Sequence, residues 1–232
     1  MFENIIKNVH NRHPLIHCIT NYVSINDCAN IVLACGGAPI MAEDINEVSQ
    51  ITSICQGLDI NIGMLNDNKL SSMLKAGATA NELGIPVILD PVGAGSSDYR
   101  IKAVQNLMSN VQFGVIRGNV SEIKAIAAKQ GIHNISAGVY DTMQKDKSAM
   151  GVEAGIADKI TDDNIKEMAD FINKLSQKTG AVIAVTGRID MVADENRVYA
   201  IRNGHKMMSL VTGAGCQLSA LTSAYVAADK EH

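Results

Sequence analysis

The sequence has few aromatic residues and few prolines. Its 232 residues include no Trp, three Phe, five Tyr and four Pro, whereas 47% of them are hydrophobic. A substantial core is therefore available, built from aliphatic side chains and Met rather than from rings. A block of basic residues is also lacking, and the formal net charge is −4. This argues against the basic, aromatic-lined surfaces that bind nucleic acids.

Signals for metal chelation and for export are also lacking. No two cysteines form a Cys-x-x-Cys pair and no His lies at ligand spacing from them, so a zinc site is not expected. An odd number of cysteines in a core-rich chain indicates free thiols and a reducing compartment. The start of the chain lacks the pattern of a signal peptide, and no apolar run is long enough to span a bilayer. We therefore expect a cytoplasmic protein without a membrane partner. Its cysteines are Cys18, Cys28, Cys35, Cys55 and Cys216.

Short apolar runs alternate with helical patterns along most of the chain. This alternation predicts an α/β fold with a mostly parallel central sheet and helices on both faces. In two further runs, 190–194 and 197–201, apolar and polar residues alternate. Glu195-Asn196 joins these runs, and the pattern predicts a β-hairpin. Residues 131–159 lack this alternation of strand and helix patterns. They are interpreted as a loop or insertion within one domain, 1–232. The predicted strands are 14–19, 38–41, 58–63, 87–90, 113–117, 181–186, 190–194 and 197–201. The predicted helices are 2–11, 24–34, 43–56, 66–83, 98–109, 120–130 and 162–177.

A Gly-rich turn, 211–216, stands out near the end of the chain. The apolar run 206–211 before it is interpreted as a strand, and the residues after it as a helix. The first N–H groups of such a helix favour an anion, and Gly213 lets a ligand approach the backbone closely. Cys216 then lies in the first helical turn, where the pKa of a thiol tends to fall. The alternative is a turn that only packs.

Charged side chains end two of the predicted strands. Asp90 is interpreted either as an acid facing Mg²⁺ or phosphate, or as a cap of its Gly-rich loop. Arg117 ends another strand and suits phosphate oxygens. Glu122 either joins Asp90 as a metal partner or forms a capping box with Asn119.

Other strand ends carry polar or adaptable side chains. Thr186 could hold a nucleotide or only form a turn, Met41 could be core filler, and Asn21 could only cap the next helix. Because ligands of α/β sheets bind beyond the carboxyl ends of the strands, these positions predict one shared site.

Taken together, the motifs resemble those of the hydroxyethylthiazole kinase family within the ribokinase-like superfamily. The resemblance is collinear and covers nearly the whole chain. It is carried by the segments 19–23 (ITNYV), 38–41 (APIM), 58–63 (LDINIG), 90–93 (DPVG), 115–122 (VIRGNVSE), 185–187 (VTG) and 211–216 (VTGAGC).

The resemblance implies transfer of the γ-phosphate of ATP to the alcohol of 4-methyl-5-(2-hydroxyethyl)thiazole in thiamine salvage. It also implies a homotrimer with sites between subunits. By position, Met41, Gly213 and, less directly, Asn21 would contact the thiazole alcohol, and Arg117 and Thr186 would contact ATP. Asp90 and Glu122 would bind Mg²⁺ directly or through water. Cys216 takes the place of the catalytic Asp of related sugar kinases.

Members of this family usually continue beyond residue 232. The resemblance therefore implies a truncated C-terminus and an incomplete adenine pocket. Two alternative functions remain open at this point. One is a related ribokinase-like kinase for a pyrimidine alcohol or a sugar, and the other is a catalytically weak nucleotide- or thiazole-binding protein.

Overall fold

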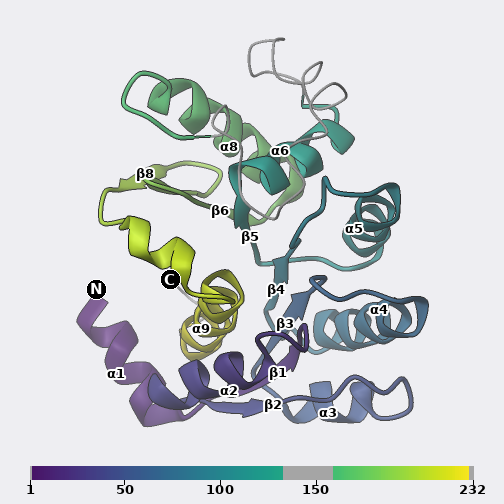
Figure 1. Ribbon diagram of the computed structural model, residues 1–232. Coiled ribbons are helices and arrows are strands. Elements are labelled where there is room, and N and C mark those ends of the chain that lie inside the picture. The colour runs from purple at the N-terminus through teal and green to yellow at the C-terminus, as the bar shows by residue number, and fades with distance from the viewer. Residues whose placement is uncertain (1, 133–158, 230–232) are drawn as a thin grey trace. The chain divides into compact units, whose positions relative to one another are not determined.

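The computed structural model describes residues 2–132 and 159–229 (Figure 1). Nearly all of the predicted insertion 131–159 lies outside the described residues. Contacts divide the chain into two compact units. Unit 1 comprises residues 1–90, 106–114 and 209–232, and unit 2 comprises residues 91–105 and 115–208. The single domain predicted for 1–232 stays a prediction.

Unit 1 contains four parallel strands in the order β2-β1-β3-β4. Because parallel strands end at the same edge, the residues that follow them are brought together there. Apart from the half-buried Leu15, the side chains of β1, β3 and β4 are buried and form the centre of this unit. The strands are β1 (Leu15–Ile19), β2 (Ala38–Ile40), β3 (Gly57–Asn61) and β4 (Val87–Asp90).

Helices cover both faces of these strands. The last helix, α9, packs on β1, β3 and β4 together with α1 and α2, whereas α3 and α4 lie on the other side (Figure 1). The buried side of α9 consists mainly of Ala and Ser, which lets its backbone approach the strands closely. These helices are α1 (Phe2–Arg12), α2 (Ile25–Ala34), α3 (Val48–Ile54), α4 (Asp67–Glu82) and α9 (Ala214–Ala228).

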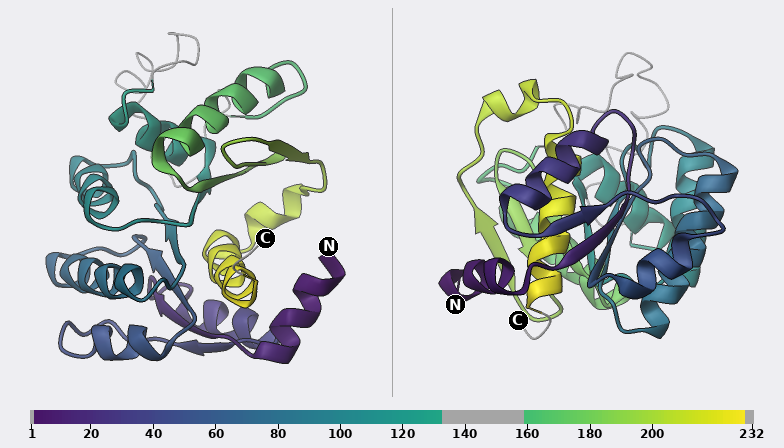
Figure 2. Two further views of the ribbon diagram at one scale, coloured as in Figure 1. Left: turned by 180° about the vertical axis from the view of Figure 1, so that it is seen from behind. Right: turned by 90° about the horizontal axis from the view of Figure 1, so that it is seen from below.

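Unit 2 combines a parallel strand pair, β5 and β6, with the predicted hairpin β7-β8. Helix α8 packs on β6 and β7, and α6 packs on β5 (Figure 2). The strands are β5 (Val115–Asn119), β6 (Val182–Thr186), β7 (Asp190–Ala193) and β8 (Val198–Ile201). The remaining α-helices of the described residues are α5 (Asp98–Asn110), α6 (Val120–Lys129) and α8 (Ile165–Thr179).

The prediction of a strand at 206–211 is wrong. Residues Lys206–Leu210 form a short 3₁₀-helix, η2, in which every side chain is exposed. The N–H of Met208 donates to the carbonyl of His205 across 3.0 Å, as in a tight helical turn. Hydrophobic residues predicted a strand, but a short apolar run has no period that separates a strand from other structures.

The helix predicted at 43–56 is shorter than expected, since α3 begins only at Val48. The carboxylate of Asp44 accepts hydrogen bonds from the backbone and side-chain N–H groups of Asn46, at 2.8 and 2.9 Å. Such a local turn competes with helix formation and delays the start of α3. None of the described helices is both long and apolar enough to cross a bilayer.

Candidate active site

A chain of polar side chains joins three strand ends of unit 1 to α9. The amide of Asn21, after β1, donates to Oδ1 of Asn61 at the end of β3 and to Sγ of Cys216, both across 3.1 Å. The amide of Asn61 donates to Oδ2 of Asp90 at the end of β4, and the hydroxyl of Ser219 donates to the same oxygen, each across 2.9 Å. All five side chains are buried. The predicted residues Asn21, Asp90 and Cys216 therefore lie in one network.

The direction of every bond in this network follows from Asp90. An ionised carboxylate only accepts hydrogen bonds, so Asn61 must turn its NH₂ group towards Asp90 and its oxygen towards Asn21. Asn21 must then turn its own NH₂ group towards Asn61 and Cys216. The opposite end of the Asn21 amide accepts the backbone N–H and the hydroxyl of Ser24, at 3.2 and 3.1 Å.

The thiol of Cys216 differs from the sequence-based expectation. Its place in the first turn of α9 predicted a lowered pKa, whereas the pKa of Cys216 is raised. Burial is the main cause and the negative charge of Asp90 adds to it, while hydrogen bonds from Ser24, Asn21 and Asn61 act in the opposite direction. Desolvation opposes the charged form more strongly than the helix end favours it. Cys216 is therefore a protonated thiol at neutral pH.

Gly213 begins α9 in a conformation that other residues rarely adopt. Its φ is +76°, and a Cβ atom added there would lie 2.6 Å from Cβ of Ser24. No side chain caps the N-terminus of α9. The Gly-rich turn predicted at 211–216 is confirmed, although it follows a 3₁₀-helix rather than a strand.

The loop after β2 carries Met41, which is half-buried. Its neighbour Ala42 is held by His17 of β1, whose Nε2 lies 2.8 Å from the Ala42 carbonyl, so Nε2 must carry the proton. Nδ1 of His17 lies 2.9 Å from the hydroxyl of Thr52 in α3. Burial lowers the pKa of His17 more than the hydrogen bond to Ala42 raises it, so the imidazole is neutral.

In unit 2, the two residues predicted to contact ATP touch each other. The guanidinium of Arg117 donates to the hydroxyl of Thr186 across 2.9 Å. Parallel pairing places Asn119 opposite Thr186, so Arg117, two residues earlier on the same face, reaches diagonally across the pair. Arg117 is nearly buried, while Thr186 is half-buried at the end of β6.

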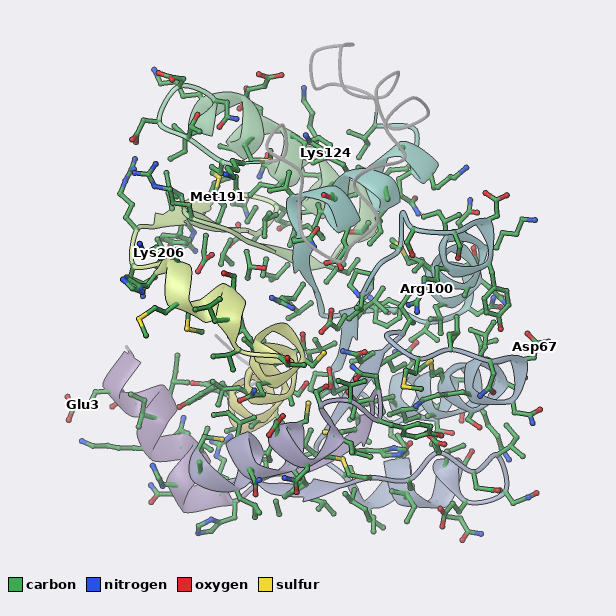
Figure 3. The ribbon with its side chains drawn as sticks, viewed as in Figure 1. Glu3, Asp67, Arg100, Lys124, Met191 and Lys206 are labelled. Atoms are coloured by element: carbon green, nitrogen blue, oxygen red, sulfur yellow. The ribbon has the colours of Figure 1, made fainter. Side chains whose placement is uncertain are left out.

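Glu122 forms the capping box that was one of its two predicted roles. Its Oε2 accepts the backbone N–H of Asn119 across 2.8 Å, and the Asn119 side chain accepts the N–H of Glu122. Its Oε1 accepts the N–H of Gly93 across 2.8 Å. The same Gly-rich loop is held by Arg100 of α5, labelled in Figure 3, which donates to the carbonyl of Val92. Glu122 therefore fixes the start of α6 and the loop after β4.

The two predicted metal partners have the right chemistry for Mg²⁺ but little exposed surface. Carboxylate oxygens suit Mg²⁺, which usually keeps several waters and takes few protein ligands. However, Asp90 is fully buried and Glu122 is only 6% exposed, and both carboxylates already accept protein donors. Within the described residues, no cluster of three or more His, Cys, Asp or Glu side chains could hold a metal. The burial of each carboxylate therefore favours an indirect role, through water, over direct coordination of a metal.

Comparison with known proteins identifies the family. A family model described as "HK: Hydroxyethylthiazole kinase family" matches residues 6–232. The chain belongs to the hydroxyethylthiazole kinase family. The resemblance carried by the motifs is thereby confirmed.

Individual members of this family agree with the assignment. A hydroxyethylthiazole kinase of Clostridium acetobutylicum is 52% identical over 229 residues, which cover 99% of this chain and 78% of that protein. A solved structure of the hydroxyethylthiazole kinase protein from Pyrococcus horikoshii is 33% identical, with a TM-score of 0.80, over 97% of this chain and 75% of that chain. A ribokinase-like superfamily protein from Enterococcus faecalis, 10% identical with a TM-score of 0.58 over 96% and 73% of the two chains, shares the fold. The predicted ribokinase-like α/β fold is confirmed.

Three residues that organise unit 1 were not predicted as functional from the sequence. Asn61 was noted only as part of a motif, Ser219 was placed in the last helix without a role, and His17 was assigned none. Asn61 ends a strand beside Asp90 in the parallel register, and this position could have indicated it. Ser219 follows Cys216 by one helical turn, which places both on the same face of α9.

Replacement of Gly213 by Ala should destabilise the protein strongly. We expect a loss of at least about 2 kcal/mol in the free energy of unfolding. An alanine is strained at this positive φ, and its Cβ would collide with Ser24. Gly84→Ala is the matched control, since Gly84 has φ +63° but nothing within 4 Å of the added Cβ. Denaturant unfolding of both variants measures the difference. Equal losses would show that the contact with Ser24 contributes nothing.

Replacement of His17 by Gln should flatten the pH dependence of stability. Below pH 6.5 the unfolded chain binds a proton that buried His17 resists, so the wild type loses stability as the pH falls. The loss reaches at most about 1.4 kcal/mol per pH unit, and it disappears in a variant that cannot titrate. Urea unfolding between pH 5 and 8 tests this, with the exposed His10→Gln as the control for replacing an imidazole by an amide. The same slope in His17→Gln and wild type would contradict the prediction.

Proposed function

We propose that this chain is a kinase that transfers the γ-phosphate of ATP to the hydroxyl of 4-methyl-5-(2-hydroxyethyl)thiazole in thiamine salvage. The observation that carries the proposal is the join between α9 and the strand ends of unit 1. There, a hydrogen-bond network with defined donors and acceptors holds the Cys216 thiol next to a helix N-terminus that has no side-chain cap. Membership of the hydroxyethylthiazole kinase family supplies the substrate.

The thiazole alcohol is assigned to residues of unit 1. Gly213 is assigned a contact through its backbone at the start of α9, since the place of a Cβ atom there is taken by Ser24. Met41 offers an adaptable apolar contact on the loop after β2. Asn21 is a weaker candidate for direct contact, because both ends of its amide already bond to protein groups. We assign it the task of holding Cys216 in place.

Cys216 is assigned a minor part in proton transfer. The hydroxyl oxygen attacks the γ-phosphorus, the bond to the ADP oxygen breaks, and the hydroxyl proton must leave. Phosphoryl transfer depends mostly on positioning and on neutralising charge, and the nucleophile needs little help from a base. A thiol with a raised pKa is a poor proton acceptor at neutral pH, so it suits this reaction better as a neighbour of the hydroxyl than as its base.

The nucleotide is assigned to Arg117 and Thr186 of unit 2. Arg117 is held by Thr186, and a guanidinium fixed in this way loses less freedom when it binds phosphate oxygens. Asp90 and Glu122 are assigned to Mg²⁺ through water, in line with their burial. When bound, Mg²⁺ neutralises phosphate charge. The chain's own contribution is the stiff loop after β4, which Glu122 and Arg100 hold.

We also propose a homotrimer, as the resemblance implies. Several large apolar side chains of unit 1 are exposed in the single chain, among them Tyr22, Val23 and Met64. An interface between subunits is one way in which such side chains become covered. Sedimentation of the purified protein measures the assembly state directly.

The function is tested by ADP production from ATP and Mg²⁺, with and without the thiazole alcohol. We expect ADP release that depends on the thiazole and follows saturation kinetics. Hydroxymethylpyrimidine and ribose serve as rival acceptors. Equal or greater turnover with either rival would reject the thiazole as the substrate. A thiazole-dependent rise in melting temperature without any turnover would indicate a binding protein.

Substitution of Cys216 tests its part in the reaction. We expect Cys216→Ala to retain activity, with kcat lowered by less than about 10²-fold, the lower end of what a general base contributes. Cys216→Asp should also remain active, because Asn21 can donate to a carboxylate at that position. Steady-state kinetics of both variants measure the effect. A loss above about 10⁴-fold in Cys216→Ala, with full activity in Cys216→Asp, would show that a base is essential.

A further inference from the structure

Lys69 is a charged residue in the interior of unit 1. It lies in the first turn of α4, and only 2% of its side chain is exposed. Lysine is almost never this deeply buried unless it is paired, so its partners identify what it does. Its ammonium lies 2.8 Å from Oε2 of Glu43, donates to the carbonyl of Thr20, and lies 4.5 Å from the centre of the Tyr22 ring.

These partners of the Lys69 ammonium lie on two loops. Thr20 and Tyr22 flank Asn21 after β1, and Glu43 follows Met41 by two residues after β2. The hydroxyl of Tyr22 also donates to the Glu43 carboxylate, which joins the two loops directly. Burial would raise the pKa of Glu43, but hydrogen bonds from Lys69 and Tyr22 and the charge of Lys69 bring it below its usual value. Glu43 is therefore ionised and paired at neutral pH.

We propose that Lys69 is a positioning residue that sets the spacing between Asn21 and Met41 and thereby the fit of the alcohol substrate. The inference rests on the proposed function, because that function assigns Met41 to the thiazole alcohol and Asn21 to the thiol beside its hydroxyl. Lys69 is assigned no contact with the substrate, because its ammonium is buried against protein groups. Its ammonium joins the carbonyl of Thr20, just before Asn21, to the carboxylate of Glu43, two residues after Met41. Small displacements of positioned groups have large effects on productive binding.

The contacts of Lys69 explain why a cation is used here. A carbonyl, a carboxylate and the face of a ring all attract positive charge, and a single ammonium offers three donors that can serve partners in different directions. An uncharged side chain of the same length would fill the space but would lose the contacts of the ammonium with Thr20 and Glu43 and leave the hydrogen bond between Tyr22 and Glu43. The role therefore depends on charge rather than on packing.

Lys69→Met tests the proposal, because Met has a similar length and no charge. We expect KM for the thiazole alcohol to rise about tenfold or more, with kcat and KM for ATP changed by less than about threefold. Lys69→Arg should restore at least part of the thiazole KM, because it retains the cation. Lys75→Met is the matched control, since Lys75 also projects from α4 and donates to the carbonyl of Ile45, yet is exposed. It should leave both KM values unchanged.

Two milder variants test the same contacts if Lys69→Met does not fold. Glu43→Gln removes one charge from a side chain that is 41% exposed, and Tyr22→Phe removes only the hydroxyl that joins the loops. Each should raise the thiazole KM by about threefold or more without a parallel change in KM for ATP. An unchanged KM for the thiazole in Lys69→Met would overturn the proposal. If Lys69→Met does not fold, an unchanged thiazole KM in both Glu43→Gln and Tyr22→Phe would overturn it instead. A parallel rise in KM for the thiazole and for ATP would overturn it as well. Absence of thiazole-dependent turnover in the wild type would instead reject the proposed function.

Discussion

The carboxylate of Asp90 is the acceptor on which the rest of the network in unit 1 depends. It lies at the end of β4 and takes hydrogen bonds from Asn61 and Ser219, which join a neighbouring strand and α9 to the same oxygen. A buried charge is tolerated only where such donors replace water. Because the donors come from separate elements, they hold the strand ends and α9 in one arrangement. The position of Cys216 follows from it through Asn21 and Asn61.

In unit 2, backbone N–H groups of separate elements donate to one carboxylate, that of Glu122. Glu122 divides its two carboxylate oxygens between the N-terminus of α6 and the loop after β4, so a residue that caps a helix also fixes a Gly-rich loop. Arg117 and Thr186 form a separate pair on adjacent strands. Capping the helix and holding the loop are thus not alternatives for Glu122, since the hydrogen bonds of the capping box leave its second oxygen for the loop.

Much of the fold could be predicted because parallel strands in α/β proteins are short, buried and apolar, and polar residues mark their ends. The position of Asp90 at the end of β4 was predicted in this way, whereas Arg117, predicted to end a strand, lies in the middle of β5. The segment 206–211 was not, because apolar composition alone does not say whether a segment is buried. The thiol pKa of Cys216 was predicted from its helix position, but burial and Asp90 outweigh that effect. Partnerships between residues distant in sequence, such as those of Lys69, depend on how loops meet in space, and a single sequence carries no direct signal of them.

The fixed direction of the bonds that lead from Asp90 to Cys216 has an evolutionary consequence. Asn21 and Asn61 each donate with one end of the amide and accept with the other, so neither can become an acid without turning a donor into an acceptor. A change at one position alters what its neighbour must offer. Substitutions along this path should therefore show strong epistasis, and drift among relatives should proceed through paired exchanges rather than through independent single steps.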